Sequence, residues 1–288
     1  MSAEQGCLRV EITSSVTLPS TSVEPTPPRA IGPLSSAVIG TLQRVRPALH
    51  ARGRLEEAFL SAVRHDVGEI GTAETVADAV DALSVEPVDG TGPSYYLRNG
   101  GTWEQMREYF MHRSLYHLGS RPARVRDPKV IGQAKASFVA VEFDEYGGGR
   151  GPLVHQQLFA DLMDAAGLDS SYLVYLDAVP ADALASVNLT SLFGLHRELR
   201  GAAIGHFAST EITSSPGSRR LVDALERMGA PEPCVGFYRE HIEADAVHEQ
   251  VVRTDVVGEL DAREPHLERD VVFGIKGATS SKTGWLCT

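Results

Sequence analysis

The chain has 288 residues, of which 42% are hydrophobic, and carries a formal net charge of −11 at pH 7. This length suits one large domain with appended segments or two small domains, and the negative charge argues against a surface for nucleic acid or anionic membrane, since both require clustered Lys and Arg. Cys7, Cys234 and Cys287 are far apart in the sequence, which excludes a zinc ribbon, thioredoxin-like chemistry and a disulfide framework.

Residues 1–36 predict a tail without stable structure, because they are rich in Ser, Thr and Pro and poor in large apolar side chains. The first residues, MSAEQGCLRVEIT, do not have the basic and apolar regions of a signal peptide. No apolar run approaches the roughly 18 residues of a membrane span. We therefore expect a soluble, cytoplasmic protein with neither nucleic acid nor membrane as a partner.

Residues 37–91 predict an N-terminal helical segment followed by a linker. Two or three helical patterns run from about Ala37 to Leu83, and Thr75 suits the N-terminal cap of the last one. The stretch 84–101, SVEPVDGTGPSYYLRNGG, is expected to be a linking loop.

Residues 92–270 predict the main domain, an all-α bundle of helices separated by short Gly and Pro breaks. Little period-two alternation is present that would indicate a sheet. Thr102 is expected to cap the first helix of this domain, and residues 271–288 are expected to form an irregular C-terminal tail. The other expected helices cover about 132–146, 152–166 after a break at 147–149, 181–213 ended by SSPGS, 218–229 and 237–250.

The segment 237–250, FYREHIEADAVHEQ, predicts three potential metal ligands on one helical face. At about 100° per residue, Asp245 lies about 40° to one side of His241, and His248 lies about 20° to the other. Apolar side chains before and after them share this side, which predicts that it faces the core. A buried Asp between two imidazoles costs free energy unless a metal ion compensates.

Further candidate ligands are polar residues at positions where an apolar residue would be expected. Glu145 follows Phe138 and Val141 on one stripe, with Glu142 and Asp144 as close alternatives. His155 precedes Leu158, Phe159 and Leu162, and Glu211 follows Ile204, Phe207 and Ala208 at helical spacing. The predicted metal ligands are thus Glu145, His155, Glu211, His241, Asp245 and His248, a set of three carboxylates and three imidazoles that suits two first-row transition-metal ions.

Structural explanations remain open beside this prediction. A lone histidine on an apolar face is more often a hydrogen-bonded core residue, and Glu211 alone would also fit a buried acid paired with Arg. The aromatic residues Trp103, Tyr109, Phe110 and Tyr116 would wall a pocket or belong to the core, and His112 and His117 are equally ambiguous.

The chain resembles the heme-oxygenase-like diiron oxidases, also described as iron-containing redox enzymes. The resemblance runs from about Tyr95 to Leu267 and is carried by TWEQMREYFMHRSLYHL, VEFDEYGGG, the inward-facing His155, GLHRELRGAAIGHFASTE and EHIEADAVHEQ. It implies an all-α, heme-oxygenase-like helical bundle without heme, in which the six predicted residues bind iron.

The resemblance further implies a non-heme enzyme that binds Fe(2+), two ions, and uses O2 as co-substrate. The implied substrate is a small amine, amino acid or fatty acid, and the implied chemistry is N-oxygenation, desaturation or C–C cleavage. A small-molecule substrate is thus the expected partner, and homodimer formation stays open.

Two features depart from the family pattern. Ten positions separate Glu145 from His155, about 80° from a common face on an unbroken helix, so the break at 147–149 must reorient the second segment. The family also closes its bundle with an apolar final helix, whereas VVFGIKGATSSKTGWLCT changes to Gly, Ser, Thr and Lys.

Three other functions compete with the oxidase. A degenerate, non-catalytic metal-binding helical protein is the main alternative, because of the atypical C-terminus. A metallohydrolase is a weaker one, since His65-Asp66 matches a phosphohydrolase dipeptide without evident partner residues. A heme-degrading enzyme is disfavoured because the acidic ligand set would repel heme propionates.

Overall fold

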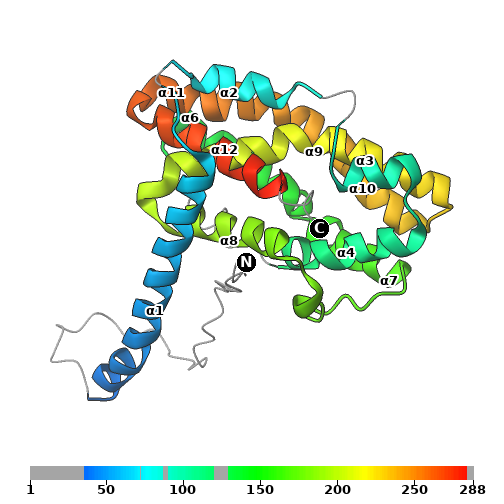
Figure 1. The fold of residues 1–288 in the computed structure, drawn as a ribbon, viewed down its shortest axis with the longest axis horizontal. Coiled ribbons are helices and arrows are strands. Elements are labelled where there is room, and N and C mark those ends of the chain that lie inside the picture. The colour runs from blue at the N-terminus through cyan, green and yellow to red at the C-terminus, as the bar shows by residue number, and fades with distance from the viewer. Residues whose placement is uncertain (1–35, 72, 87–89, 120–128, 284–288) are drawn as a thin grey trace, which may run out of the picture.

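The computed structural model describes residues 36–71, 73–86, 90–119 and 129–283, with side chains described from His50 to Thr279 within these ranges. Within them the chain forms helices and no strands (Figure 1). The predicted all-α class is therefore confirmed. The predicted tail at 1–36 lies almost entirely outside the described residues, as do 284–288 of the predicted C-terminal tail.

The helices follow one another along the chain with short connections. The α-helices are α1 (Ser36–Val67), α2 (Val76–Leu83), α3 (Pro93–Gly100), α4 (Trp103–Leu118), α6 (Gly132–Glu145), α7 (His155–Ala165), α8 (Ala181–Leu195), α9 (Arg200–Met228), α10 (Glu232–Val251), α11 (Glu259–Arg263) and α12 (Glu268–Thr283). Short 3-10 helices are η1 (Gly147–Gly149), η2 (Gly151–Leu153), η3 (Leu176–Ala178), η4 (Arg197–Leu199) and η6 (Pro265–Leu267), and η5 (Val252–Gly258) is a π-helix.

Two helices begin at the predicted capping residues. The Thr75 side chain accepts a hydrogen bond from the Asp78 backbone N–H, and the Asp78 carboxylate accepts one from the Thr75 backbone in return. Thr102 and Gln105 make the same reciprocal pair at the start of α4. Each pair satisfies backbone donors that a helix leaves unbonded at its N-terminus.

Helix α9 lies at the centre of the bundle, with α10 on one side and α12 on another (Figure 1). One apolar core joins α6, η5, α12 and the first half of α9, and includes Phe138, Phe207, Val256 and Val272. A second core joins α4, α7, α10 and the second half of α9, and includes Phe110, Phe159 and Leu225. The first half of α10 lies in the second core, and the predicted triad runs from the middle of this helix, at His241, into its second half.

Glycines allow α9 and α12 to approach closely. A Cβ atom at Gly205 of α9 would overlap the carbonyl oxygen of Val271, and one at Gly274 of α12 would overlap the carbonyl oxygen of Ala202. The two backbones are therefore in direct contact, and no side chain fits between them.

The C-terminal region differs from the expectation of an irregular tail from residue 271. Residues as far as Thr283 continue as α12, whose Val271, Val272 and Ile275 are buried against the core. The Gly, Ser and Thr content that suggested an irregular tail includes Gly274, which the contact with α9 requires. Tertiary packing thus outweighs the weak helix propensity of this segment.

Two other boundary predictions were wrong. The helix expected over 181–213 breaks at His196 and η4, and the SSPGS segment does not end α9 but lies inside it, with Pro216 in the helix interior. Proline removes one backbone hydrogen bond, and the buried Ile212 and Leu221 on either side hold the helix together. The expected loop at 84–101 also contains α3.

Among the described helices, not one combines the length and the apolar character that crossing a membrane requires.

Candidate metal centre

The six predicted ligands come from four helices and gather between the two cores. Glu145 ends α6, His155 begins α7, Glu211 lies in the middle of α9, and the other three lie on α10. Their exposed fractions range from 1% for Asp245 to 7% for Glu145. Buried acids and imidazoles are uncommon in protein cores unless they are paired or bind metal.

The triad of α10 lies on the buried face of the helix, as its spacing predicts. His241, Asp245 and His248 are all buried, and so are Phe237 and Tyr238 one turn earlier. The positions between them, such as Glu240 and Val247, are exposed. The stripe therefore faces the core over its whole length.

Glu145 and His155 form the first part of the cluster together with His241. The Oε2 atom of Glu145 lies 3.1 Å from Nδ1 of His155. The rings of His155 and His241 are 4.4 Å apart between centroids. A carboxylate of α6 and two imidazoles, one each from α7 and α10, thus lie next to one another.

The glycine break between α6 and α7 makes this meeting possible. Gly147, Gly148 and Gly149 all have positive φ angles, between 60° and 82°, a region that other residues rarely adopt. A Cβ atom at Gly147 would also lie 2.6 Å from the backbone carbonyl carbon of Leu153. The predicted reorientation of the second segment is therefore observed, and it depends on these glycines.

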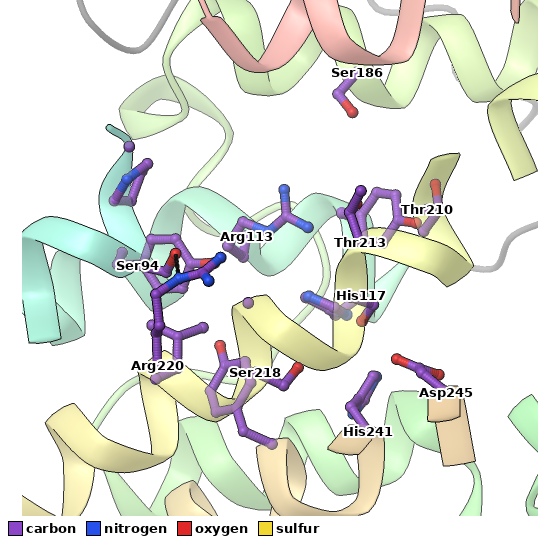
Figure 2. Close-up of a pocket in the computed structure, with 18 of the residues that line it drawn as sticks. Ser94, Arg113, His117, Ser186, Thr210, Thr213, Ser218, Arg220, His241 and Asp245 are labelled. Atoms are coloured by element: carbon purple, nitrogen blue, oxygen red, sulfur yellow. Dashed lines mark hydrogen bonds between the residues drawn. The ribbon is translucent and has the colours of Figure 1, made fainter. Parts of the chain in front are cut away.

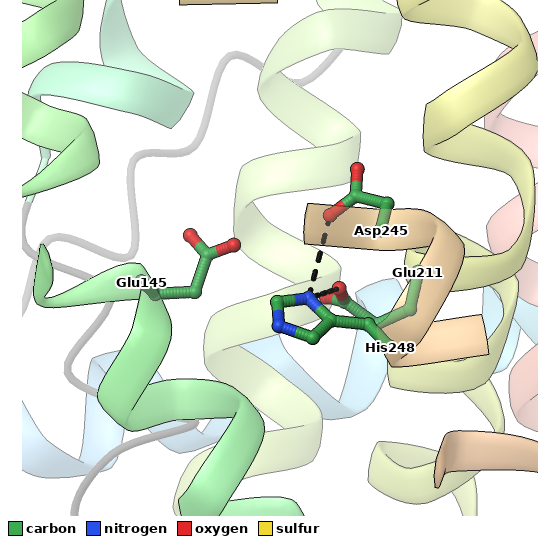
Figure 3. Close-up of side chains that lie close together, drawn as sticks. All are labelled: Glu145, Glu211, Asp245 and His248. Carbon is green, nitrogen blue, oxygen red and sulfur yellow. Dashed lines mark ion pairs between the residues drawn. The ribbon is translucent and has the colours of Figure 1, made fainter. Parts of the chain in front are cut away.

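Glu211, Asp245 and His248 form the second part of the cluster (Figure 3). The Nδ1 atom of His248 lies 3.4 Å from Oε2 of Glu211 and 3.4 Å from Oδ1 of Asp245. Together with Glu145, these residues offer four ligand atoms that lie within 4.8 Å of one another. The two parts of the cluster are thus joined through Glu145.

The donor set fits a metal ion. Three carboxylates within this small, buried space repel one another, and buried charges are costly unless they are compensated. Both carboxylate oxygens of Asp245 are buried, and neither makes a hydrogen bond with the described residues. Oxygen and imidazole ligands without thiolate suit iron and other first-row transition metals.

Two of the histidines are oriented by partners outside the cluster. The Nδ1–H group of His241 donates to the Phe237 carbonyl over 2.8 Å, which directs Nε2 toward the cluster. Nε2 of His248 lies 3.2 Å from Oδ2 of Asp144, which leaves Nδ1 facing Glu211 and Asp245. Such partners fix the tautomer of a metal-binding histidine.

The two histidines differ in their affinity for protons. Burial, together with the nearby His155, lowers the pKa of His241, so its imidazole is neutral and can bind a metal ion. Burial also disfavours the charged form of His248, but its contacts with Asp245 and Glu211 outweigh this and raise its pKa to about 11. Without metal, the proton on His248 provides a counter-charge for the carboxylates.

Sequence reasoning did not recognise every polar group of this region. Asp144, weighed as an alternative to Glu145, is 60% exposed and contacts the cluster only through His248. Glu142, the other alternative, is 4% exposed and lies one turn before Glu145. The role of Asp144 had no sequence signal because it depends on how α6 and α10 pack.

A cavity of about 350 Å³ opens onto the cluster, and Glu145, Glu211, His241 and Asp245 lie in its wall. Tyr109, Tyr116 and His117 of α4 also line it. By contrast, Trp103 and Phe110 do not line it and instead pack edge to face with ring centroids 6.3 Å apart. The aromatic residues of α4 are thus divided between cavity and core. Cavities of this size commonly hold small organic ligands.

The dipeptide His65-Asp66 takes no part in this site. Both residues are exposed near the end of α1, whereas the metal-type cluster is buried. The structure therefore gives no support to a metallohydrolase built on them.

Comparison with known proteins agrees with this site. A family model described as iron-containing redox enzyme matches residues 107–281, which is more than half of the chain and includes all six cluster residues. The match extends beyond Leu267, where the sequence resemblance ended, and covers most of α12. A search of curated proteins finds no match to the chain. The chain therefore belongs to the iron-containing redox enzyme family.

Proposed function

We propose that this protein is a non-heme diiron oxidase or oxygenase that uses O2 to oxidise a small molecule. Membership of the iron-containing redox enzyme family makes it an iron-dependent oxidoreductase. The observation that supports the finer proposal is the convergence of three carboxylates and three imidazoles in one buried cluster beside a cavity.

The two parts of the cluster suggest how two ions are held. Glu145, His155 and His241 would bind one ion, and Glu211, Asp245 and His248 the other. Three carboxylates offset three of the four positive charges of two ferrous ions. Bound ferrous iron supplies the electrons that O2 activation requires.

The residues of the chain set the conditions for this chemistry. The Phe237 carbonyl and Asp144 hold the rings of His241 and His248 in fixed orientations. The apolar cores on both sides restrict water, which strengthens electrostatic interactions within the site. The cavity holds the substrate next to the metal-binding side chains.

The substrate belongs to the small amines, amino acids and fatty acids, and the reaction is N-oxygenation, desaturation or C–C cleavage. The size of the cavity supports a small substrate. The alternative of a degenerate, non-catalytic protein rested on a missing final helix, and α12 removes that reason.

Anaerobic iron titration followed by exposure to O2 tests the proposal. We expect two ferrous ions to bind per chain, followed by O2 consumption and a transient visible absorbance band. His241→Ala should lose the band and the stoichiometric binding. Iron binding without O2 consumption would favour the non-catalytic protein, and absence of stoichiometric iron binding would refute the proposal.

A further inference from the structure

The lining of the cavity also contains polar side chains that are not among the six cluster residues, among them Arg113 and Tyr238. Figure 2 shows Arg113 projecting from α4 and Arg220 projecting from α9, with His241 and Asp245 at another part of the same cavity. These two arginines are the only Lys or Arg residues in the described lining. Their environments differ, and the difference indicates a ligand.

Arg220 is already paired. Its guanidinium makes an ion pair with Glu86, donates a hydrogen bond to the Ser94 hydroxyl over 3.1 Å, and lies 4.0 Å above the ring of Tyr95. These contacts satisfy its charge within the protein. Arg220 therefore has little capacity left for a ligand.

Arg113 has no such partner. Among the described residues no carboxylate lies within ion-pair distance of its guanidinium, and its buried Nε atom makes no hydrogen bond. The guanidinium lies 4.8 Å from the ring centroid of Tyr116, a contact that positions it without neutralising its charge. A partly buried cation without a counter-charge favours an anionic ligand.

Tyr238 provides an independent observation. Its side chain lines the cavity, it is only 4% exposed, and its hydroxyl makes no hydrogen bond with the described residues. Its ring is fixed by stacking on Phe110, with centroids 6.3 Å apart. Burial raises the pKa of Tyr238 well above its usual value, so the hydroxyl keeps its proton and remains a donor. The positive charge of Arg113 acts on the same hydroxyl.

We infer that Arg113 and Tyr238 together bind the carboxylate of a small, largely apolar acid. The guanidinium offers several N–H donors and the phenol one O–H donor, and a carboxylate oxygen accepts from both kinds. The aromatic rings of Tyr109, Tyr116 and Phe237 line the space for the apolar body. The identification of this acid as the substrate rests on the proposed oxidase function, whereas the binding site itself does not.

Within the proposed function, this inference selects among substrate classes. An acid held at Arg113 would extend its apolar body toward Glu145, Glu211 and His241, which line the same cavity. A simple amine would place its positive charge beside Arg113, which is unfavourable. The structure therefore favours a carboxylic acid over an amine without a carboxylate.

The test measures binding of octanoate and of its neutral analogue octanamide by isothermal titration calorimetry. Both metal-free protein and anaerobic iron-loaded protein are used, so that no turnover occurs. We expect octanoate to bind the metal-free protein at least about tenfold more tightly than octanamide, because only the acid pairs with the guanidinium. This comparison needs no variant and cannot be affected by misfolding.

Substitutions in the cavity test which side chains contribute to octanoate binding. Arg113→Gln should weaken octanoate binding about tenfold or more, Arg113→Lys should restore part of it, and Tyr238→Phe should weaken it a few-fold. The matched control is Arg220→Gln, which alters the other arginine of the cavity and should change the affinity less than about twofold, since Arg220 is already paired. Circular dichroism confirms that each variant is folded.

Several outcomes would overturn the inference. These are no octanoate binding at millimolar concentration, equal affinity for acid and amide, or equal weakening by the two Gln variants. Binding that requires iron and is abolished by His241→Ala would show that the carboxylate binds the metal instead. Failure of the oxidase proposal would be seen separately, as absent iron binding or O2 consumption while octanoate still binds at Arg113.

Discussion

Helix α9 packs against its two main neighbours in opposite ways. Against α12 it presents Gly205, whose missing side chain lets the backbones touch, within an apolar surface. Against α10 it presents Glu211, which faces Asp245 and His248 in a buried polar cluster. At these positions one contact consists of close backbone packing and the other of buried charged groups, although the second half of α9 also packs on α10 through apolar side chains.

The two contacts make different contributions to stability. Close apolar packing stabilises the fold without any ligand. Buried carboxylates destabilise the metal-free fold and become favourable once a cation is bound. The contact between α9 and α12 therefore supports the fold that keeps the polar cluster in place, and the two contacts should respond differently to substitution.

The largest effect is expected at the glycine contact. Gly205→Ala should lower the free energy of unfolding by about 3 kcal/mol, because the new methyl group overlaps the Val271 carbonyl and the helices must separate. Urea unfolding of the metal-free protein measures this change. The control is Gly236→Ala in α10, where no atom lies within 4 Å of the new methyl group, and a gain of about 0.5 to 1 kcal/mol is expected. Equal urea midpoints for wild type and Gly205→Ala would contradict the close contact.

A substitution in the polar cluster should weaken metal binding without lowering the stability of the metal-free protein. Asp245→Asn removes a buried charge, so the metal-free protein should be as stable as wild type or more stable. Its affinity for ferrous iron should fall by about 100-fold or more. Loss of a group that only orients a metal ligand already lowers metal affinity by about 10- to 100-fold. Thermal unfolding with and without metal measures both quantities. A large loss of stability in the metal-free variant would show that Asp245 is structural.

The pH dependence of metal binding follows from His248. Because its pKa is raised to about 11, the metal-free protein holds this proton throughout the neutral range, and a metal ion must displace it. Affinity should therefore rise about tenfold per pH unit between about pH 6 and about pH 8. His241 adds little to this slope because its pKa is lowered. Anaerobic titrations at several pH values measure the slope, and His248→Gln should flatten it.

The smallest effect is expected at Asp144, which touches the cluster only through His248 and is 60% exposed. Asp144→Asn should weaken metal binding by about tenfold or less, because it loosens the ring orientation while leaving every ligand in place. Asp161→Asn, at an exposed site on α7 where the carboxylate bonds Gln157, is the matched control and should have no effect. An effect as large as that of Asp245→Asn would mean that Asp144 binds metal directly.

The sequence predicts best what depends on local periodicity. The triad of α10 lies on one face because a regular helix fixes the angles between positions 241, 245 and 248. The break between Glu145 and His155 was also predictable, since three successive glycines interrupt a helix. These features align three ligands on α10 and reorient His155 relative to Glu145, whereas Glu211 joins them only through the packing of α9 on α10.

The remaining features depend on contacts between distant segments. Nothing local indicates that α9 continues through Pro216, because the burial of Ile212 and Leu221 on either side decides it. The final helix α12 is stable because Gly274 fits against Ala202 of α9. The presence of Arg113 and Tyr238 in the wall of one cavity likewise depends on the contact between α4 and α10, which no spacing in the sequence reveals.

The π-helix η5 indicates where this chain can tolerate the deletion of a residue. It follows α10 directly and continues into α11 with helical backbone angles at both ends. Its hydrogen bonds span five residues instead of four, so it holds an extra residue within a continuous helix. Deleting one residue of η5 can be absorbed by a return to α-helical bonding. Deleting one between His241 and His248 would turn the remaining ligands by about 100° and separate them. Natural length changes in relatives should therefore fall in η5 and spare α10.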